Sequence, residues 1–283
     1  MTEDAIRGVA ASKMRKGDPA IASIGVAEVG AVLVLGMRDL RRAPVLGAAI
    51  GLLFVAGGWF IYALVALADL LFLAYPLAAG FTLLGPFAAI ALYDVSRRLE
   101  TVDRLSWREV LGTVLGPGAR SLGWMPMLNL FVFIIWIDVA AALFLSFFGL
   151  TRMEAGEFLS ELFTTTHGLL FLALGNAVGA IFAVGVYAST VLAYPMLLDR
   201  DTNFVTAIAT SWRAVRANPV PMLLYGVLVA VLTFLAILPA LLGLILALPL
   251  FGHTSWHLYR RVVRWEEPGE VRAEGVDTAH RAA

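Results

Sequence analysis

Residues 124–149 read WMPMLNLFVFIIWIDVAAALFLSFFG, and Asp138 is the one charged side chain among them. The hydrocarbon core of a bilayer is about 30 Å thick, and a helix needs roughly 20 predominantly apolar residues to cross it. Because lipid offers the backbone no hydrogen-bonding partner, an apolar run of this length is predicted to be a helix rather than a strand. The chain is therefore predicted to be an all-α, polytopic membrane protein.

Further stretches of the same character flank residues 124–149 on both sides. They are residues 44–68, 70–93, 168–198, 219–238 and 240–258. The breaks at Asp69 and Pro239 are short, so the spans beside each break are expected to form tight hairpins. We predict six transmembrane helices, arranged as three helical hairpins.

The composition of the whole chain agrees with a membrane protein. Of its 283 residues, 60% are hydrophobic and 15% are charged, whereas a soluble domain is about 45–50% apolar and about 25% charged. Lys and Arg number 21, as do Asp and Glu, so the chain has no basic excess and no nucleic acid is expected as a partner. The absence of cysteine excludes disulfides, zinc–cysteine sites and iron–sulfur clusters.

The distribution of cations predicts which side of the membrane each connection faces. The apolar segment 20–37 carries Glu28 and is expected to lie flat at the interface rather than to cross. With six spans, all of the 21 Lys and Arg residues except Arg152 then lie on one side. Cations favour the cytoplasmic side, so both termini are predicted to be cytoplasmic. Residues 20–264 are expected to form a single membrane domain, with flexible ends at 1–19 and 265–283.

Two segments suggest that the hairpins repeat. Residues 37–44 (MRDLRRAP) and 212–219 (WRAVRANP) place Arg, an aliphatic residue, Arg and Pro at identical offsets. Residues 106–110 (SWREV) match 211–215 (SWRAV) before the middle hairpin. Each hairpin is therefore predicted to follow a cytoplasmic amphipathic helix, in three parallel units. Chance matches in a chain rich in Arg and Val are the alternative.

The amphipathic helix before the fifth span has the clearest pattern. Apolar residues recur at helical spacing, namely Phe204, Ile208, Trp212 and Val215. Asp201 or Thr202 is expected to cap the start of this helix.

Two polar residues are predicted at the middle of spans. Asp138 costs about 2.5–3.5 kcal/mol there on insertion scales, so by default it marks a functional site. Asn176 in the fourth span is a candidate partner at comparable depth. A proton pathway would need a chain of such groups. We therefore favour the interpretation that these residues form a single interhelical hydrogen bond, which fixes the packing of the helices.

The second and sixth spans end on the same predicted side with polar and aromatic residues. The candidate cytoplasmic-face cluster comprises Tyr93, Asp94, Arg97, His253, His257, Tyr259 and Arg260. A repeat of hairpins could bring both ends into a central bundle, where these groups would suit an anionic headgroup or a loop of a partner. The alternative is that each segment anchors only its own helix.

His253 and His257 also form a candidate metal site, since they are four residues apart and share one helix face. A metalloprotease motif needs Glu after the first histidine, where this chain has Thr254. No third ligand is obvious, so structural histidines are favoured, and no cofactor is predicted.

Gly85-Pro86, residues 92–98 (LYDVSRR) and residues 253–260 (HTSWHLYR) together resemble a family of bacterial integral membrane proteins, domain of unknown function 2189. The resemblance extends from about residue 21 to 264 and includes Arg38-Asp39-Leu40 with Pro44. It implies a six-span protein of the bacterial cytoplasmic (inner) membrane, without an established activity, cofactor or catalytic residue. Some relatives carry a cytochrome c oxidase label, which is compatible with an accessory role beside respiratory complexes.

No Walker motif, nucleophile elbow or dinucleotide fingerprint is present in the sequence. We therefore expect a non-enzymatic accessory or scaffold protein that binds membrane lipids or partner proteins, such as another membrane protein or a respiratory complex. A small-solute or lipid transporter is the first alternative, because of Gly85-Pro86 and Asp138. A metal-dependent membrane enzyme, based on His253 and His257, is the second.

Overall fold

The computed structural model describes residues 19–67, 85–102, 105–115, 120–149 and 155–265. Apart from one pair of two-residue strands, the regular structure in these ranges is helical. The first half contains β1 (Ala20–Ile21), α2 (Val26–Arg42), α3 (Pro44–Leu67), α5 (Gly85–Leu99), α6 (Trp107–Leu115) and α7 (Arg120–Phe148). The second half contains α8 (Ala155–Thr164), α9 (Thr166–Thr190), α10 (Ala193–Asp199), α11 (Phe204–Ala217), α12 (Pro219–Ile237), α13 (Leu244–Val262) and β2 (Val263–Arg264).

Four segments are long and apolar enough to cross a membrane, which agrees with an integral membrane protein. They are Pro44–Ala63, Trp124–Phe148, Thr166–Asp199 and Pro219–Ile237. The predicted second span, 70–93, lies partly outside the described residues, and its described part belongs to α5. The predicted sixth span, 240–258, corresponds to α13, which is not among the four. Six spans and three hairpins therefore stay a prediction, and the predicted ends at 1–19 and 265–283 lie almost wholly outside the described residues.

The helices predicted before the hairpins are present as α2, α6 and α11, although two local details differ. The flat helix expected over 20–37 begins only at Val26, because the backbone N–H of Gly25 donates to Glu28 Oε2 at 2.9 Å and closes the first turn there. The cap of α11 is Asn203, whose side chain accepts from the Thr206 N–H at 2.8 Å, and neither Asp201 nor Thr202. Only Asn203 directly precedes the first helical residue, where a cap must stand.

The two similar segments that precede α3 and α12 have the same backbone turn. Ala43 has φ −128° and ψ 52°, and Asn218 has φ −129° and ψ 55°. Each residue ends its helix with an N–H bond to the carbonyl four residues earlier, and each precedes a proline. Proline disfavours a helical conformation of the residue before it, and its fixed φ suits the first turn of a new helix. The shared chemistry therefore ends one helix and starts the next in both places.

The fourth predicted span, 168–198, is divided into α9 and α10 by a turn at Val191 and Leu192. Pro195 lies in the first turn of α10 and has no N–H to donate to the carbonyl of Val191. The helix is therefore interrupted near the end of the predicted span.

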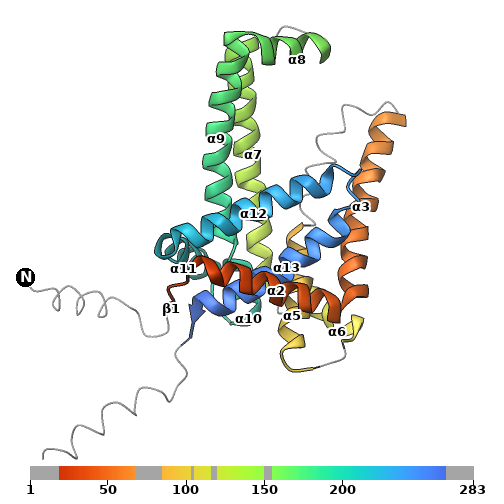
Figure 1. Cartoon of the computed structure of the whole chain (residues 1–283), viewed down its shortest axis with the longest axis vertical. Helices are drawn as coiled ribbons and strands as arrows, with labels where there is room; N and C mark the ends of the chain where they lie inside the picture. The colour runs from red at the N-terminus through yellow and green to blue at the C-terminus, as the bar shows by residue number, and fades with distance from the viewer. Residues whose placement is uncertain (1–18, 68–84, 103–104, 116–119, 150–154, 266–283) are drawn as a thin grey trace, which may run out of the picture.

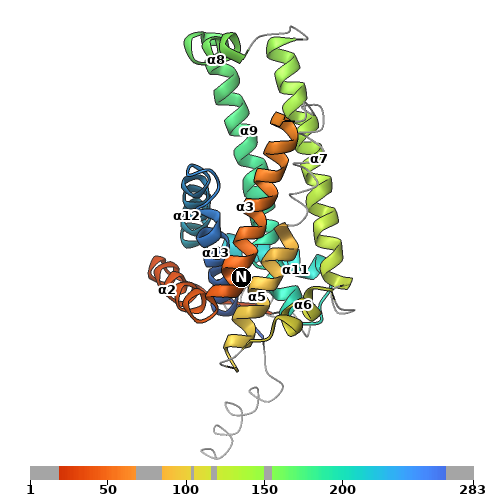
Figure 2. The same cartoon turned by 90° about the vertical axis from the view of Figure 1, so that its right-hand side faces the viewer.

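Helix α13 lies at the centre of the fold and packs against α2, α3 and α5 (Figures 1 and 2). Its residues Trp256, Leu258 and Val262 are fully buried. Gly36 of α2 lets the two helices approach closely, since a Cβ atom there would lie 2.9 Å from the backbone nitrogen of Thr254.

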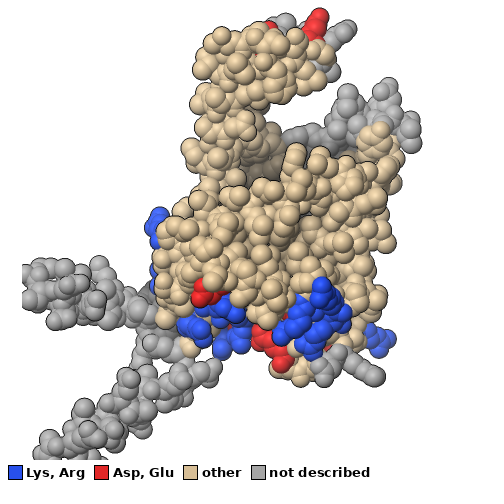
Figure 3. Space-filling model, viewed as in Figure 1, with Lys and Arg blue, Asp and Glu red and all other residues tan. Residues whose placement is uncertain are grey.

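Helices α7 and α9 form a hairpin that projects from this centre and ends in α8 (Figures 1 and 2). At the projecting end, aromatic rings from α7, α8 and α9 pack together, among them Phe144, Phe148, Phe158, Phe171 and His167. On the face seen in Figure 3, most Lys and Arg side chains gather at the opposite end of the molecule, and acidic side chains lie on α8. An uncharged zone separates the two on this face.

Candidate functional site

Helices α2, α5 and α13 enclose a group of buried polar side chains. Asp39, Ser96, His253 and Thr254 have 0% exposed surface and His257 has 6%. Burying such groups is costly unless they are hydrogen-bonded. Their partners therefore show what the cluster can do.

Asp39 and His257 form the shortest contact between α2 and α13 in this cluster. Asp39 Oδ2 lies 2.7 Å from Nε2 of His257. Burial alone raises the pKa of the Asp39 carboxyl group, but hydrogen bonds from His257 and Ser96, together with the positive potential of the histidines, bring the pKa below its ordinary value of 3.8. Asp39 is therefore a carboxylate at neutral pH and ties α2 to α13 by a charged hydrogen bond.

His253 bonds to a different helix, although it lies one turn from His257. Its Nδ1 is 2.8 Å from Oγ of Ser96 on α5. Its Nε2 is buried and has no hydrogen-bond partner among the residues that the structure describes. Among the described residues, no group of three or more His, Cys, Asp or Glu side chains is arranged to hold a metal ion. The two histidines thus bind two different neighbours, and no third ligand of these types joins them in the described ranges.

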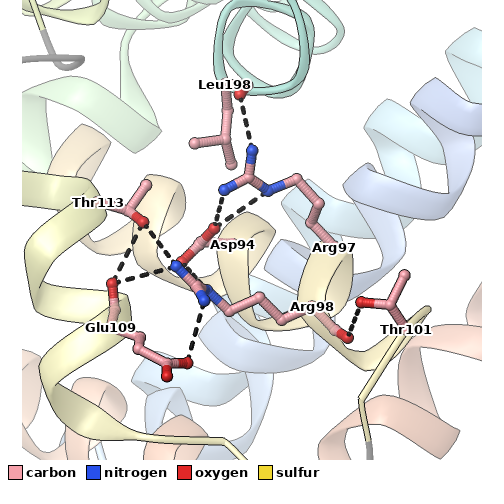
Figure 4. A network of polar contacts seen from close by, with 7 residues as sticks. All are labelled: Asp94, Arg97, Arg98, Thr101, Glu109, Thr113 and Leu198. Carbon is pink, nitrogen blue, oxygen red and sulfur yellow. Dashed lines mark hydrogen bonds and ion pairs between the residues drawn. The ribbon is translucent and has the colours of Figure 1, made fainter.

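Asp94 is the centre of a second network, shown in Figure 4. Its buried carboxylate accepts from Arg97 and from Arg98 Nε, the latter at 2.8 Å. Arg97 also donates to the carbonyl of Leu198 at 3.3 Å, and Arg98 donates to Glu109 Oε2 at 3.0 Å. The network therefore joins α5 to α6 and α10, with its central negative charge neutralised locally.

A third group of contacts surrounds the end of α13. Glu100 accepts from Trp256 Nε1 at 2.8 Å and forms an ion pair with Arg260, whose Nε lies 3.4 Å from the Glu100 carboxylate. The Tyr259 hydroxyl donates to Asp199 at 2.7 Å, and Arg260 lies 3.8 Å from the same carboxylate. Burial and the nearby Asp199 carboxylate both raise the pKa of Tyr259, so its phenol stays protonated and serves as a donor.

The seven residues of the candidate cluster lie on two helices that pack directly against each other. Tyr93, Asp94 and Arg97 belong to α5, whereas His253, His257, Tyr259 and Arg260 belong to α13. Four residues outside the predicted cluster act as acceptors or bridging groups, namely Asp39, Ser96, Glu100 and Asp199. Asp39 lies in the Arg38-Asp39-Leu40 motif and Ser96 in the motif of residues 92–98. Their positions in these motifs could have identified them. That the cluster binds a ligand stays a prediction.

The two predicted intramembrane polar residues do not pair in the structure. Asp138 and Asn176 are both exposed on the projecting hairpin. Asn176 donates instead to the Leu172 carbonyl of its own helix at 2.7 Å. No hydrogen bond joins Asp138 to Asn176 in the part of the chain that the structure describes. A different pair forms between α7 and α10, where Asn129 Nδ2 donates to the Tyr194 hydroxyl at 3.0 Å.

Comparison with known families gives one match. Residues 74–199 match the model of the family described as "Predicted integral membrane protein (DUF2189)". This confirms the resemblance read from the sequence, over the matched residues. No curated protein and no solved structure matches the chain.

Proposed function

We propose that this chain, similar over residues 74–199 to the DUF2189 family of predicted integral membrane proteins, is a non-enzymatic accessory or scaffold protein. It binds anionic lipids at its cationic end and supports another membrane protein, for which a respiratory complex is a candidate. We further propose six spans as three hairpins, with α5 and α13 completing the count, and both termini on the cytoplasmic side of a bacterial inner membrane.

The observation that carries this proposal is that the acidic side chains between the helices are engaged by partners within the fold. Asp39 is bonded to His257, Asp94 to Arg97 and Arg98, and Asp199 to Tyr259, with Arg260 nearby. Each contact joins different helices or fixes the end of one. These contacts stabilise the packing of the helices. They occupy the acidic side chains that could otherwise bind a substrate, which supports a scaffold rather than an enzyme.

Exposed cations on α2, α6 and α13, at the end of the molecule opposite α8, support lipid binding. Arg38 has 54% of its side chain exposed and Arg260 has 45%, and Arg41 and Arg108 are exposed as well. Exposed apolar side chains stand beside them on α2 and α6, including Val34, Met37, Trp107 and Leu111. Cations together with apolar side chains suit the headgroup layer of a membrane that contains anionic lipids.

Lipid-dependent stability tests the proposal. The full chain is placed in nanodiscs of phosphatidylcholine, with or without phosphatidylglycerol, and its unfolding temperature is measured. Phosphatidylglycerol is expected to raise that temperature. Arg41→Gln combined with Arg108→Gln should reduce the increase, since each cation near the surface contributes about 1 kcal/mol. Glu157→Gln, on α8 at the opposite end, is the control and should leave the increase unchanged.

An equal increase in the wild type and the double variant would contradict lipid binding by these cations. A transporter is tested separately with proteoliposomes that contain a pH-sensitive dye. Proton flux that depends on the protein and is lost in Asp138→Asn would overturn the scaffold proposal.

A further inference from the structure

A cavity of about 360 Å³ lies where helices of all three predicted hairpins meet, and it shares Tyr93 with the candidate cytoplasmic-face cluster. Its walls come from α3, α5, α7, α9, α10, α12 and α13, and they are mostly apolar. The polar side chains that line it include Tyr93, Tyr187, Tyr194, Tyr225, Asn129 and Ser255. A mostly apolar hollow of this size with a few polar groups is typical of a small-molecule site.

The residues identified in the cavity wall carry no formal charge. An ionised ligand would lose its hydration there without gaining a partner of opposite charge, which disfavours its binding. The chemistry of the wall therefore selects an uncharged molecule.

The hydrogen bonds that the polar side chains of the wall already make indicate whether the polar group of the ligand should be a donor or an acceptor. Tyr187 donates to the Met222 carbonyl at 2.6 Å, and Tyr225 lies 2.8 Å from Ser255 Oγ, so both hydroxyls are already engaged. Tyr93 shares Ser255 as a partner with Tyr225. The Tyr194 hydroxyl accepts from Asn129, and no acceptor for its own proton is found among the described residues. Tyr194 is therefore a phenolic donor that remains for a carbonyl, ester or alcohol oxygen.

A second cavity of about 320 Å³ shares Asn129 with the first. It is bounded by α7, α9 and α11 and is lined mainly by apolar and aromatic side chains, among them Leu128, Val132, Ile181, Phe182 and Trp212. The first cavity contains more polar side chains than the second, and the Asn129–Tyr194 hydrogen bond involves the residue that lines both.

We propose that the two cavities bind one uncharged lipid with an oxygen-bearing head, whose head accepts a hydrogen bond from Tyr194 and whose chain lies between α7 and α9. Diacylglycerols and prenyl alcohols share this chemistry. The site is separate from the cationic end and from the lipids proposed to bind there. Either proposal can therefore fail while the other stands.

The test uses the purified full chain in detergent micelles and native mass spectrometry. Dioleoylglycerol and farnesol are the two neutral probes, and dioleoyl phosphatidic acid is the charged counterpart. At least one neutral probe is expected to bind one-to-one, at least tenfold more tightly than the phosphatidic acid. Whichever neutral probe binds identifies the source of the lipid.

Three variants locate the site. Tyr194→Phe keeps the ring and removes the donor, so it should weaken binding about 3- to 10-fold, as expected for one lost hydrogen bond. Val229→Phe adds volume to the wall of the first cavity and should weaken binding more than tenfold. Tyr62→Phe is the matched control, because Tyr62 is 65% exposed on α3 and lies outside both cavities.

Binding of neither neutral probe would overturn the proposal, as would equal binding of phosphatidic acid. Unchanged affinity in Tyr194→Phe, with an unfolding temperature like that of the wild type, would also overturn it. If Val229→Phe does not fold, Tyr194→Phe alone decides, since it changes a single hydroxyl group.

Discussion

Asp39 illustrates how a residue quoted in a short sequence motif takes part in a tertiary contact. It stands among Arg38, Arg41 and Arg42, and its Oδ1 accepts from Arg38 Nη2 at 3.3 Å. The structure also buries Asp39 completely and joins its Oδ2 to His257, 218 positions further along the chain. The helical period explains this, because one face of α2 points to α13 while the arginines point outward.

Replacement of this carboxylate should destabilise the protein. Asp39→Asn keeps the shape but removes the charged hydrogen bond to His257, so the free energy of unfolding should fall by about 1.5–3 kcal/mol. Unfolding by SDS in mixed micelles at neutral pH measures it. Asp201→Asn, at an exposed position, is the matched control and should change stability by less than about 0.5 kcal/mol.

The difference between wild type and Asp39→Asn should also depend on pH. The folded-state pKa of Asp39 lies below its ordinary value of 3.8, so its contribution is complete above that value and is lost as pH falls through the lowered pKa. The wild-type advantage should hold from pH 7 to about 5 and shrink below about 4. An advantage that persists unchanged well below that pH would contradict an ionised Asp39.

At the scale of elements, the approach of α2 to α13 depends on a residue without a side chain. Gly36 lies where the backbone of α13 at Thr254 passes closest. Gly30 lies in the same helix, six residues earlier, and a Cβ atom there would meet nothing within 4 Å. Both glycines are helical, but Gly36 packs against α13 whereas the space beside Gly30 is open.

Alanine substitutions at these two glycines should have opposite effects. Gly30→Ala should stabilise the protein by about 0.5–1 kcal/mol, since alanine loses less backbone entropy in a helix. Gly36→Ala should destabilise it by about 1–3 kcal/mol, because the added methyl group forces α2 and α13 apart. SDS-induced unfolding compares both with the wild type. A stabilising Gly36→Ala would mean that the two helices are not in contact in the membrane.

At the scale of the whole molecule, the cations lie mainly at one end. On the face seen in Figure 3 most cations, together with some acidic side chains, gather at the end opposite α8. Helix α8 has Glu157 and Glu161 and no Lys or Arg. The projecting α7–α9 hairpin carries α8 away from the cationic end (Figure 1). This distribution supports the proposed orientation, because cations favour the cytoplasmic side of the membrane.

Single cysteines test this orientation directly, since the natural chain contains none. Ser160→Cys on α8 should react with a membrane-impermeant maleimide added to intact cells. Val102→Cys, at an exposed position after α5, should react only after the cells are permeabilised. The cysteine-free wild type is the control for background labelling. The reverse pattern would refute cytoplasmic placement of the cationic end.

The sequence by itself determined the membrane character, four of the six predicted apolar spans, and the amphipathic helices that precede α3, α7 and α12. These features depend on neighbouring residues: the length of an apolar run, helical spacing, and a proline that ends one helix and starts another. The same information indicated that the ends of α5 and α13 carry related polar groups. It did not identify Asn203 as a cap, because Asp201 and Thr202 have equally suitable side chains and only the first helical residue distinguishes them.

Only the tertiary structure decided which polar groups meet. The bonds of His257 to Asp39, of His253 to Ser96 and of Trp256 to Glu100 join residues more than 150 positions apart. It also decided that Asn129 pairs with Tyr194, while Asp138 and Asn176 stay apart. The physical reason is that a side chain needs a partner, but its own sequence neighbourhood does not specify which one. That choice follows from how closely the helices approach, which is set by packing across the whole fold.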